Sequence, residues 1–203
     1  DGPPEGVETY EAADSDNDGL NDKKEKELGT DPFISDSDGD TVEDKAEIEE
    51  YDTNPTKTDT DGDGLTDGEE IFLLNSDPLK KDTNSNGMSD EKEAEAGADP
   101  SKIDTDQDSL TDKKEILEYN TEPAKKDTDG DGLADKEEIE IGKTDPTKSD
   151  TDNDGLNDRE ELRVYSTNPT KADTDGDGFE DGQEVQNDYN PNGEGELKIE
   201  TNS

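Results

Sequence analysis

The stretch Asp59-Thr-Asp-Gly-Asp-Gly-Leu-Thr-Asp-Gly-Glu-Glu70 decides how this chain is organised. It has acidic residues at its first, third, fifth, ninth and twelfth positions and glycine at its sixth. Segments with nearly the same pattern recur 22 or 23 residues apart, and they begin at Asp14, Asp36, Asp59, Asp82, Asp104, Asp127, Asp150 and Asp173. Self-similarity at such a short period is typical of tandem repeats. We therefore predict eight repeats over residues 14–191, with linkers at 1–13 and 192–203.

The composition excludes an ordinary hydrophobic domain. The chain has 203 residues and a net charge of −44, and only 27 of its residues are Leu, Ile, Val or Phe. Ordering the backbone costs about 1–2 kcal/mol per residue, whereas burying one large aliphatic side chain returns about 1.5–3 kcal/mol. The chain is therefore either disordered, or its folding energy comes from something other than the polypeptide.

The charge and the missing residue types narrow the partners. The sequence contains no Cys and no His, which excludes disulfides and the commonest transition-metal ligands. Nucleic acids and anionic membranes would repel such an acidic surface, and no apolar run is long enough to span a bilayer. We expect a cationic partner and a monomeric chain.

The acidic segments match the spacing of calcium loops with oxygen ligands. Calcium takes six to eight oxygens, and alternate carboxylates in a wrapped loop supply them. Glycine at position six permits a sharp turn, position seven gives its main-chain carbonyl, and the glutamate at position twelve can give two oxygens. Isolated acidic runs are usually solvated, but five carboxylates crowded eight times into twelve residues favour bound cations. We predict calcium, about one ion per repeat or more.

The predicted ligands occupy equivalent positions in all eight loops. The side-chain ligands are Asp14, Asp16, Asp18, Asp22 and Glu25; Asp36, Asp38, Asp40, Asp44 and Glu47; Asp59, Asp61, Asp63, Asp67 and Glu70; Asp82, Asn84, Asn86, Asp90 and Glu93; Asp104, Asp106, Asp108, Asp112 and Glu115; Asp127, Asp129, Asp131, Asp135 and Glu138; Asp150, Asp152, Asp154, Asp158 and Glu161; and Asp173, Asp175, Asp177, Asp181 and Glu184. The main-chain carbonyls come from Leu20, Val42, Leu65, Met88, Leu110, Leu133, Leu156 and Phe179.

Three loops depart from the pattern. Thr41 and Ser109 replace the glycine at position six of loops two and five, where a left-handed backbone strains a side chain. Asn84 and Asn86 replace two carboxylates of loop four. We expect loops two, four and five to bind calcium most weakly.

A short helix is expected after each loop. The acids at positions nine and twelve, such as Asp67 and Glu70, form an Asp-x-x-Glu capping box. We expect the helix to run two turns and to end at Gly29, Gly97 or Gly142, or before the residue that precedes proline. A small core should form from position seven, position thirteen and a third residue near the helix end, which is Leu28, Tyr51, Leu74, Tyr119, Ile141 or Tyr165.

A proline connector of fixed length follows each helix. Each of the first seven prolines lies four positions before the first aspartate of the next loop. The one-residue variation in repeat length therefore lies between the glutamate at position twelve and the proline. The acid or amide before each proline is either an Asx-turn acceptor or a ligand of a second ion, and we favour the turn. The lysine two residues after most of these prolines is expected to be a solvated charge.

The fold class that follows is irregular and mainly loop with short α-helices. We expect an elongated, calcium-stabilised tandem-repeat array, a solenoid-like rod without a large hydrophobic core.

The segment Asp59–Asp67 and its seven copies resemble the thrombospondin type 3 repeat, in its bacterial form with a Thr-Asp-Pro connector. The resemblance implies a calcium-filled array in a secreted or cell-surface protein. The animal repeats carry disulfides, which this chain lacks. Paired EF-hands and dockerins fit less well, because position eight is mostly polar here and the repeats number eight.

The resemblance favours a calcium-rigidified spacer or stalk, with an adhesin as one such protein, located outside the cell or on its surface. The alternative is a soluble calcium or lanthanide buffer. We expect no enzymatic activity, because the sequence singles out no nucleophile or base.

Overall fold

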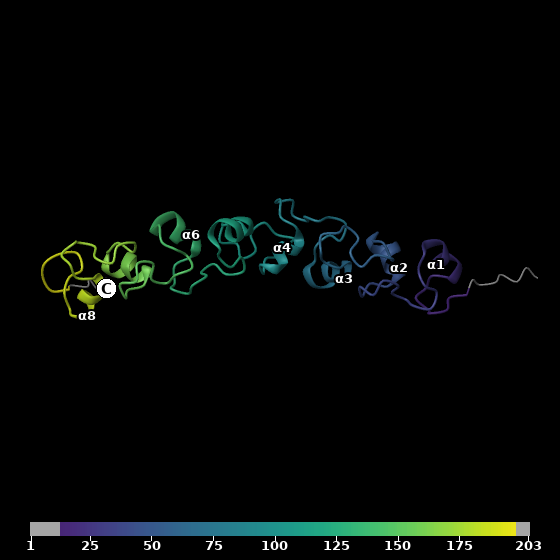
Figure 1. Cartoon of the computed structure of the whole chain (residues 1–203), viewed down its shortest axis with the longest axis horizontal. Helices are drawn as coiled ribbons and strands as arrows, with labels where there is room; N and C mark the ends of the chain where they lie inside the picture. The colour runs from purple at the N-terminus through teal and green to yellow at the C-terminus, as the bar shows by residue number, and fades with distance from the viewer. Residues whose placement is uncertain (1–12, 198–203) are drawn as a thin grey trace, which may run out of the picture. The chain divides into compact units, whose positions relative to one another are not determined.

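The computed structural model describes residues 13–197, in which short helices alternate with longer loops (Figure 1). The α-helices are α1 Asp22–Leu28, α2 Asp44–Ala46, α3 Asp67–Glu69, α4 Asp90–Glu95, α5 Asp112–Lys114, α6 Asp135–Glu137, α7 Asp158–Glu160 and α8 Asp181–Gln186. Five of them continue into π-helices, which are η1 Glu47–Tyr51, η2 Glu70–Leu74, η3 Glu115–Tyr119, η4 Glu138–Gly142 and η5 Glu161–Tyr165. Within the described range there is no strand, and Tyr189 and Glu196 form an isolated antiparallel bridge. The expected class of loops with short helices is confirmed.

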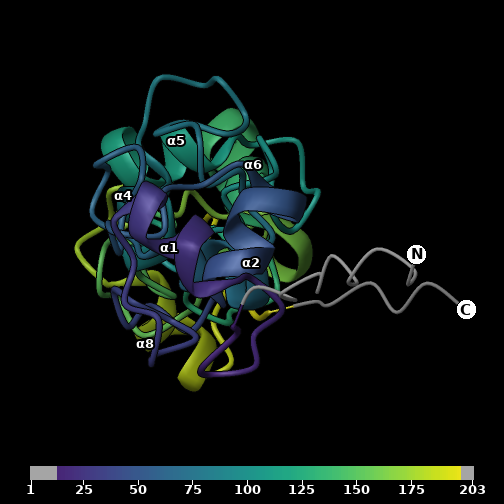
Figure 2. The ribbon, with the colours of Figure 1, turned by 90° about the vertical axis from the view of Figure 1, so that its right-hand side faces the viewer.

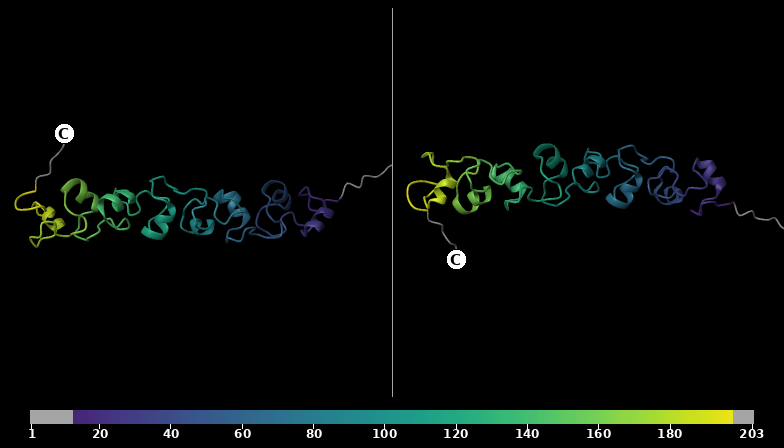
Figure 3. Two further views of the ribbon diagram at one scale, coloured as in Figure 1. Left: turned by 90° about the horizontal axis from the view of Figure 1, so that it is seen from above. Right: turned by 60° about the horizontal axis from the view of Figure 1, so that its bottom comes forward.

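The described chain divides into two compact units. One unit comprises the described residues up to Glu95 together with Asp99–Ser101. The other comprises Ala96–Ala98 and the described residues from Lys102 onward. Figure 2 turns the first repeat, with α1, toward the viewer, and Figure 3 gives two more views of the alternating loops and helices. The expected linkers at 1–13 and 192–203 fall partly outside the described residues. Residues 192–197, which are described, fold back so that Leu197 N–H donates to the Asp188 carbonyl (2.9 Å).

Each helix begins one residue earlier than the capping box predicts. The N-cap is position eight, and in repeats three and seven Thr66 and Asn157 form complete capping boxes with Glu69 and Glu160. Position nine is already the first helical residue. The prediction that the aspartate at position nine is the cap is therefore wrong. Its carboxylate instead accepts hydrogen bonds from position two of its own loop, for example from Thr60.

The π-helices absorb the one-residue variation in repeat length. In repeats one, four and eight the proline lies seven positions after the glutamate, and the helices of these repeats are entirely α. In the other five repeats the proline lies eight positions after the glutamate, and each of these repeats contains a π turn. The extra residue is inserted into the helix because the glutamate before it and the proline after it are both buried in every repeat. Such single-turn insertions are the usual form of π-helix.

In repeats one to seven the helical segment ends in a left-handed residue, whereas the C-cap of α8, Asn187, has φ of −103°. Gly29 and Gly97 have φ of +94° and +81°, as predicted for helix-terminating glycines. The prediction fails at Gly142, which lies inside η4, because the π turn moves the left-handed position on to Lys143 (φ +59°).

The apolar contacts are small and are repeated from unit to unit. Position seven is buried in six repeats, but Phe179 in the last repeat is 57% exposed. Ile141 is exposed, which contradicts its predicted place in the core. The π turn puts Gly142 at the position that Tyr51 and Leu74 occupy in other repeats, four residues after the glutamate. The proline of every connector is also buried, so it belongs to the core although the apolar pattern did not predict it.

Each connector is a tight turn. The amide of the lysine two residues after the proline donates to the carbonyl of the residue before it, as Lys57 does to Asn54 (2.9 Å). Proline suits the second position of such a turn because its φ is fixed there. The side chains of these lysines are exposed, as predicted, although three of them pair with the acid before the proline, which is Asp77, Glu122 or Asp145.

None of the helices between residues 13 and 197 has the length and apolar character of a membrane span.

Candidate metal sites

The acidic loops are shaped by their own carboxylates. In loop three, Asp59 accepts hydrogen bonds from the amides of Gly62 (2.6 Å) and Gly64 (3.1 Å). Asp61 Oδ1 accepts from Asp63 N–H (3.0 Å), and Asp63 Oδ1 accepts from Leu65 N–H (2.9 Å). Positions four and six have positive φ in every loop. Both oxygens of Asp59 and one oxygen each of Asp61 and Asp63 therefore hold the wrapped backbone in place.

At positions three and twelve, a carboxylate oxygen is left without a partner. Asp61 Oδ2 and Glu70 Oε2 are buried and accept no hydrogen bond from any described residue. The same holds at position three for Asp16, Asp38, Asp106, Asp129 and Asp152, and at position twelve for Glu25, Glu47, Glu115, Glu138, Glu161 and Glu184. The position-twelve glutamates are 0% exposed in repeats one to seven and 7% in repeat eight. Buried carboxylates normally require a compensating partner.

These oxygens lie close enough together to share one ion. The carboxylates at positions one, three and five have oxygens within 4.8 Å of one another in loops one, two and three. Hard oxygen donors crowded in this way suit calcium. The buried, unpartnered oxygens are what a cation would satisfy, so the residues present fit the ion that the sequence predicts.

The electrostatics also favour a cation. Burial and the neighbouring charge of Asp38 together raise the pKa of Glu47 to about 8. The pKa of Glu138 likewise rises to about 8, through burial and the charge of Asp129. Burial and the charge of Asp63 raise the pKa of Asp61 to about 6. Each loop therefore concentrates negative charge that a bound cation would neutralise.

Position nine lies between two repeats. Asp67 accepts hydrogen bonds from Thr60 N–H (2.8 Å) and Thr60 Oγ1–H (2.7 Å) of its own loop. An oxygen of Asp67 also lies within 4.8 Å of oxygens of Asp40 and Glu47 in the preceding repeat. The aspartate at position nine is 0% exposed in repeats two to eight, whereas Asp22 of the first repeat is half-buried. The structure therefore places this predicted ligand against the loop of the repeat before it.

The aspartate at position five connects successive repeats. Its Oδ2 accepts a hydrogen bond from the main-chain N–H at position ten of the next repeat. The two residues lie 28 positions apart in the sequence. The pairs are Asp40–Gly68 (3.2 Å), Asp63–Glu91 (3.0 Å), Asp131–Arg159 (3.0 Å) and Asp154–Gly182 (3.0 Å). A predicted metal ligand is thus also the acceptor at the contact between neighbouring repeats.

The three loops that depart from the sequence pattern differ in the structure as well. Thr41 and Ser109 have φ of +85° and +78°, so non-glycine residues occupy the left-handed position six of loops two and five. In loop four, the amide of Asn84 donates to both oxygens of Glu93 (3.0 and 3.2 Å), and the amide of Asn86 donates to one of them (2.7 Å). Weaker calcium binding by these loops stays a prediction.

The Asp or Asn before seven of the eight prolines adopts the turn that we favoured, and the exception is Glu122. Asn54 Oδ1 accepts from the amide (3.2 Å) and the hydroxyl (2.9 Å) of Thr56, and Asp145 Oδ1 accepts in the same way from Thr147. These contacts belong to the connector and support the Asx-turn interpretation.

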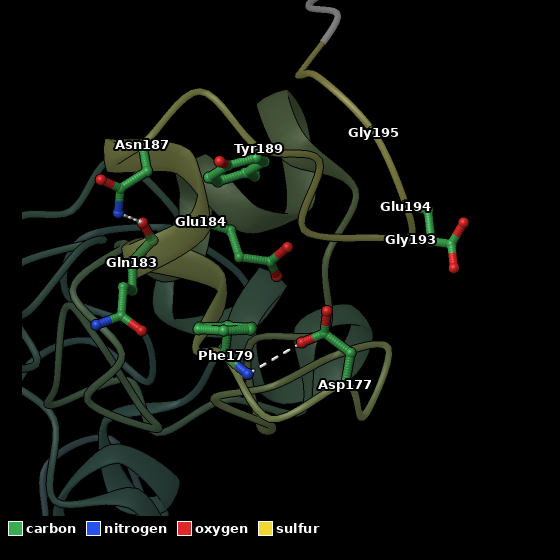
Figure 4. Close-up of a pocket in the computed structure, with 9 residues that line it drawn as sticks. All are labelled: Asp177, Phe179, Gln183, Glu184, Asn187, Tyr189, Gly193, Glu194 and Gly195. Atoms are coloured by element: carbon green, nitrogen blue, oxygen red, sulfur yellow. Dashed lines mark hydrogen bonds between the residues drawn. The ribbon is translucent and has the colours of Figure 1, made fainter.

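The last loop is open on one side. A cavity of about 580 Å³ adjoins loop eight, and its lining includes Asp177, Phe179, Glu184 and Tyr189 (Figure 4). In six of the earlier repeats the position-seven side chain is buried, whereas Phe179 and Tyr189 are each more than half exposed. The last site is therefore the most accessible to solvent.

Two kinds of hydroxyl residue were missed by the sequence analysis. Position two is Ser or Thr in all eight loops, and in loops one to seven its amide and hydroxyl both hold the aspartate at position nine, as Thr128 holds Asp135. A second hydroxyl, just before the acid or amide of the connector, contacts the position-twelve glutamate in five repeats, as in Thr53 and Glu47. Their recurrence at fixed positions was the available signal.

Comparison with known families gives one extended match. The model of the bacterial TSP3 repeat matches residues 14–33, 59–81, 127–149, 150–172 and 173–192, which together make up more than half of the chain. The three unmatched repeats are those with Thr41, with Asn84 and Asn86, and with Ser109.

Other comparisons are short. No curated protein matches. A structure titled "Biofilm associated protein - B domain" is 36% identical over 22% of this chain and 11% of its own, with a TM-score of 0.22. One titled "Biofilm associated protein - BSP domain" is 36% identical over 22% of this chain and 8% of its own, also with a TM-score of 0.22. The family match and the eightfold acidic loop lead to one assignment: this chain belongs to the bacterial TSP3 repeat family, whose tandem repeats are calcium-binding structural units.

Proposed function

We propose that this chain is a calcium-rigidified spacer or stalk of a secreted or cell-surface protein, such as an adhesin. Each of the eight loops takes about one calcium ion, through the side chains at positions one, three, five, nine and twelve and the carbonyl at position seven. The repeats then stack into an elongated, monomeric rod over residues 14–191.

The observation that carries the proposal is the set of buried, unpartnered carboxylate oxygens in successive loops. Asp129 Oδ2 and Glu138 Oε2 illustrate it in loop six. With few apolar side chains to offset their burial, these charges would destabilise the fold unless cations neutralised them. Metal binding and folding are then one equilibrium, as in other small domains without a sufficient core.

The contact between repeats explains how a bound ion would stiffen the array. Asp131 has one oxygen bonded to Leu133 N–H (2.7 Å) in its own loop and the other bonded to Arg159 N–H (3.0 Å) in the next repeat. An ion that fixes Asp131 therefore also fixes where the next helix begins. Repeating this contact gives a shape set by nearest neighbours, as in other repeat proteins.

Small-angle X-ray scattering with and without calcium tests the proposal. A compact globule of this length would have a radius of gyration of about 17 Å, and an unfolded chain about 48 Å. We expect an intermediate value and a rod-like profile in calcium. After chelation we expect expansion and a loss of helical circular dichroism, which Mg²⁺ at the same concentration does not reverse.

Two results would contradict the proposal. One is an unchanged scattering profile and helix signal in calcium-free buffer. The other is calcium binding to a chain that stays expanded and flexible, which would favour the alternative function of a calcium or lanthanide buffer.

A further inference from the structure

One hydroxyl contact recurs at the position-twelve glutamate. In five repeats, the Ser or Thr just before the acid or amide of the connector donates its hydroxyl to Oε1 of that glutamate. The pairs are Thr53–Glu47 (3.1 Å), Ser76–Glu70 (3.1 Å), Thr121–Glu115 (3.3 Å), Thr144–Glu138 (3.1 Å) and Thr167–Glu161 (3.0 Å). The contact is built into the fold, since the four threonines are only 6–8% exposed.

The hydroxyl residue holds its glutamate at both ends. Thr144 N–H donates to the main-chain carbonyl of Glu138 (3.3 Å), while its hydroxyl donates to the carboxylate (3.1 Å). The other oxygen of Glu138 is buried and accepts no hydrogen bond from the described residues. The contact thus fixes the side chain and leaves one oxygen directed at the loop.

The π turn creates this geometry. All five contacts occur in repeats with a π-helix, where the hydroxyl residue is six positions after the glutamate. In the α-helical first repeat, Thr30 is five positions after Glu25. There the buried Thr30 hydroxyl and both Glu25 oxygens have no hydrogen-bond partner among the described residues. The equivalent residues of repeats four and eight are Ala98 and Tyr189, which have no aliphatic hydroxyl.

We propose that this Ser or Thr hydroxyl is a positioning residue for the metal site of its repeat. The inference rests on the proposed calcium function. By holding the glutamate in its binding orientation before the ion arrives, the hydroxyl reduces the side-chain ordering that accompanies binding. Removing a residue that hydrogen-bonds to a metal ligand typically lowers the affinity for the metal by about 10–100-fold.

A fivefold variant tests this in the whole chain. T53V/S76A/T121V/T144V/T167V removes the five hydroxyls and nearly preserves side-chain volume. The matched control T30V/T56V/T147V/T170V removes four hydroxyls that contact no position-twelve glutamate. In calorimetric calcium titrations we expect five ions to bind about tenfold or more weakly in the fivefold variant, three ions to bind as in the wild type, and the control to match the wild type.

A second readout separates positioning from general stability. Tb³⁺ emission lifetimes in H₂O and D₂O count the water molecules on the bound ion. We expect a higher mean count in the fivefold variant, because a glutamate that is no longer held is more readily replaced by water. Serine in place of valine at the four threonine positions should restore both the calcium affinity and the number of water molecules on the bound ion, because Ser76 makes the same contact in the native chain.

A single-site version covers the case in which the fivefold variant does not fold. The amide of Gly132, at position six of loop six, reports by NMR on the filling of that loop. T144V should shift its calcium midpoint about tenfold, and T144S should restore it. Unchanged midpoints and water counts in the valine variants, or equal losses in the control, would overturn the inference. If the wild-type chain bound no calcium, the proposed function itself would fail.

Discussion

At the scale of single residues, the aspartate at position three of the acidic loop uses its two oxygens differently. One oxygen of Asp38 accepts the amide of Asp40, while the other is buried without a partner among the described residues. The first oxygen shapes the loop and the second is available to a cation. A loop built in this way is preorganised by its own ligands, and replacing an aspartate removes both a ligand and a backbone contact.

Loop four provides a test of charge. Its amides already occupy the oxygens of Glu93. N84D/N86D replaces these donors with carboxylates, so we expect the calcium affinity of repeat four to rise about tenfold, or about 1.4 kcal/mol. Calorimetry should show one more tight ion than in the wild type. The matched control is D106N/D108N in loop five, which should remove one bound ion. An unchanged titration of N84D/N86D would contradict the prediction.

The raised pKa values of the glutamates predict a pH dependence. Burial raises the pKa of Glu70, Glu115 and Glu161 from the ordinary 4.5 to about 8. Between those values the folded, calcium-free chain binds more protons than the unfolded chain, so its stability falls as the pH rises from about 4.5 to 8. Circular dichroism in calcium-free buffer should show more helix at pH 5 than at pH 8.5.

Calcium and protons compete for the same oxygens, which gives the opposite trend for binding. We expect calcium affinity to rise from pH 5 to about pH 8. Calorimetry at pH 7 in buffers of different ionisation enthalpy should show protons released on binding. A calcium-free chain that gains helix as the pH rises, or binding without proton release, would contradict this account.

The sequence predicted the loop chemistry better than the loop's surroundings. The period, the positive φ at position six and the short helices followed from the residues, because glycine and aspartate have strong local preferences. The role of Asp67 at position nine did not follow. A local capping box was the obvious interpretation, whereas its contacts reach Thr60 and the preceding repeat. Contacts between repeats leave little trace in a single repeat's pattern.

At the scale of helices, repeat length and helix type are coupled. The one-residue variation was visible in the sequence, but its place inside a π turn was not, and the error at Gly142 and Ile141 has this single cause. Because the glutamate and the proline are buried at either side of the helix, an inserted residue can be accommodated only between them. The π turn is therefore a regular part of five repeats.

The start of α3 predicts a sensitive substitution. A Cβ at Gly68 would lie 2.1 Å from the carbonyl oxygen of Asp40, and main-chain atoms cannot move away as a side chain can. We expect G68A to destabilise the contact between repeats two and three by about 1–3 kcal/mol, seen as faster hydrogen exchange of the residue 68 amide in calcium.

The control for this substitution is K136A at position ten of repeat six, where a side chain is already present. Lys136 donates only a long hydrogen bond to Ser109 (3.4 Å), so exchange there should change little. Equal protection of residue 68 in the wild type and G68A would refute the close approach.

At the scale of the whole molecule, charge dominates. The net charge of −44 is spread along every repeat. Without calcium, this charge repels itself over about 10 Å at 0.1 M salt and about 30 Å at 0.01 M. We expect the calcium-free chain to have a larger hydrodynamic radius at 0.01 M than at 0.5 M NaCl, measured by light scattering. The calcium-bound chain should change much less, and equal salt responses of the two forms would argue against neutralisation by calcium.

The contact from position five to the next repeat has a consequence for how such chains evolve. The donor at position ten is a main-chain N–H, and in four repeats that make this bond the position holds Gly68, Glu91, Arg159 or Gly182. Except where the backbones approach as closely as at Gly68 and Gly182, any amino acid other than proline supplies this donor. Gene duplication or deletion can therefore lengthen or shorten the protein in steps of 22 or 23 residues without inventing a new complementary surface.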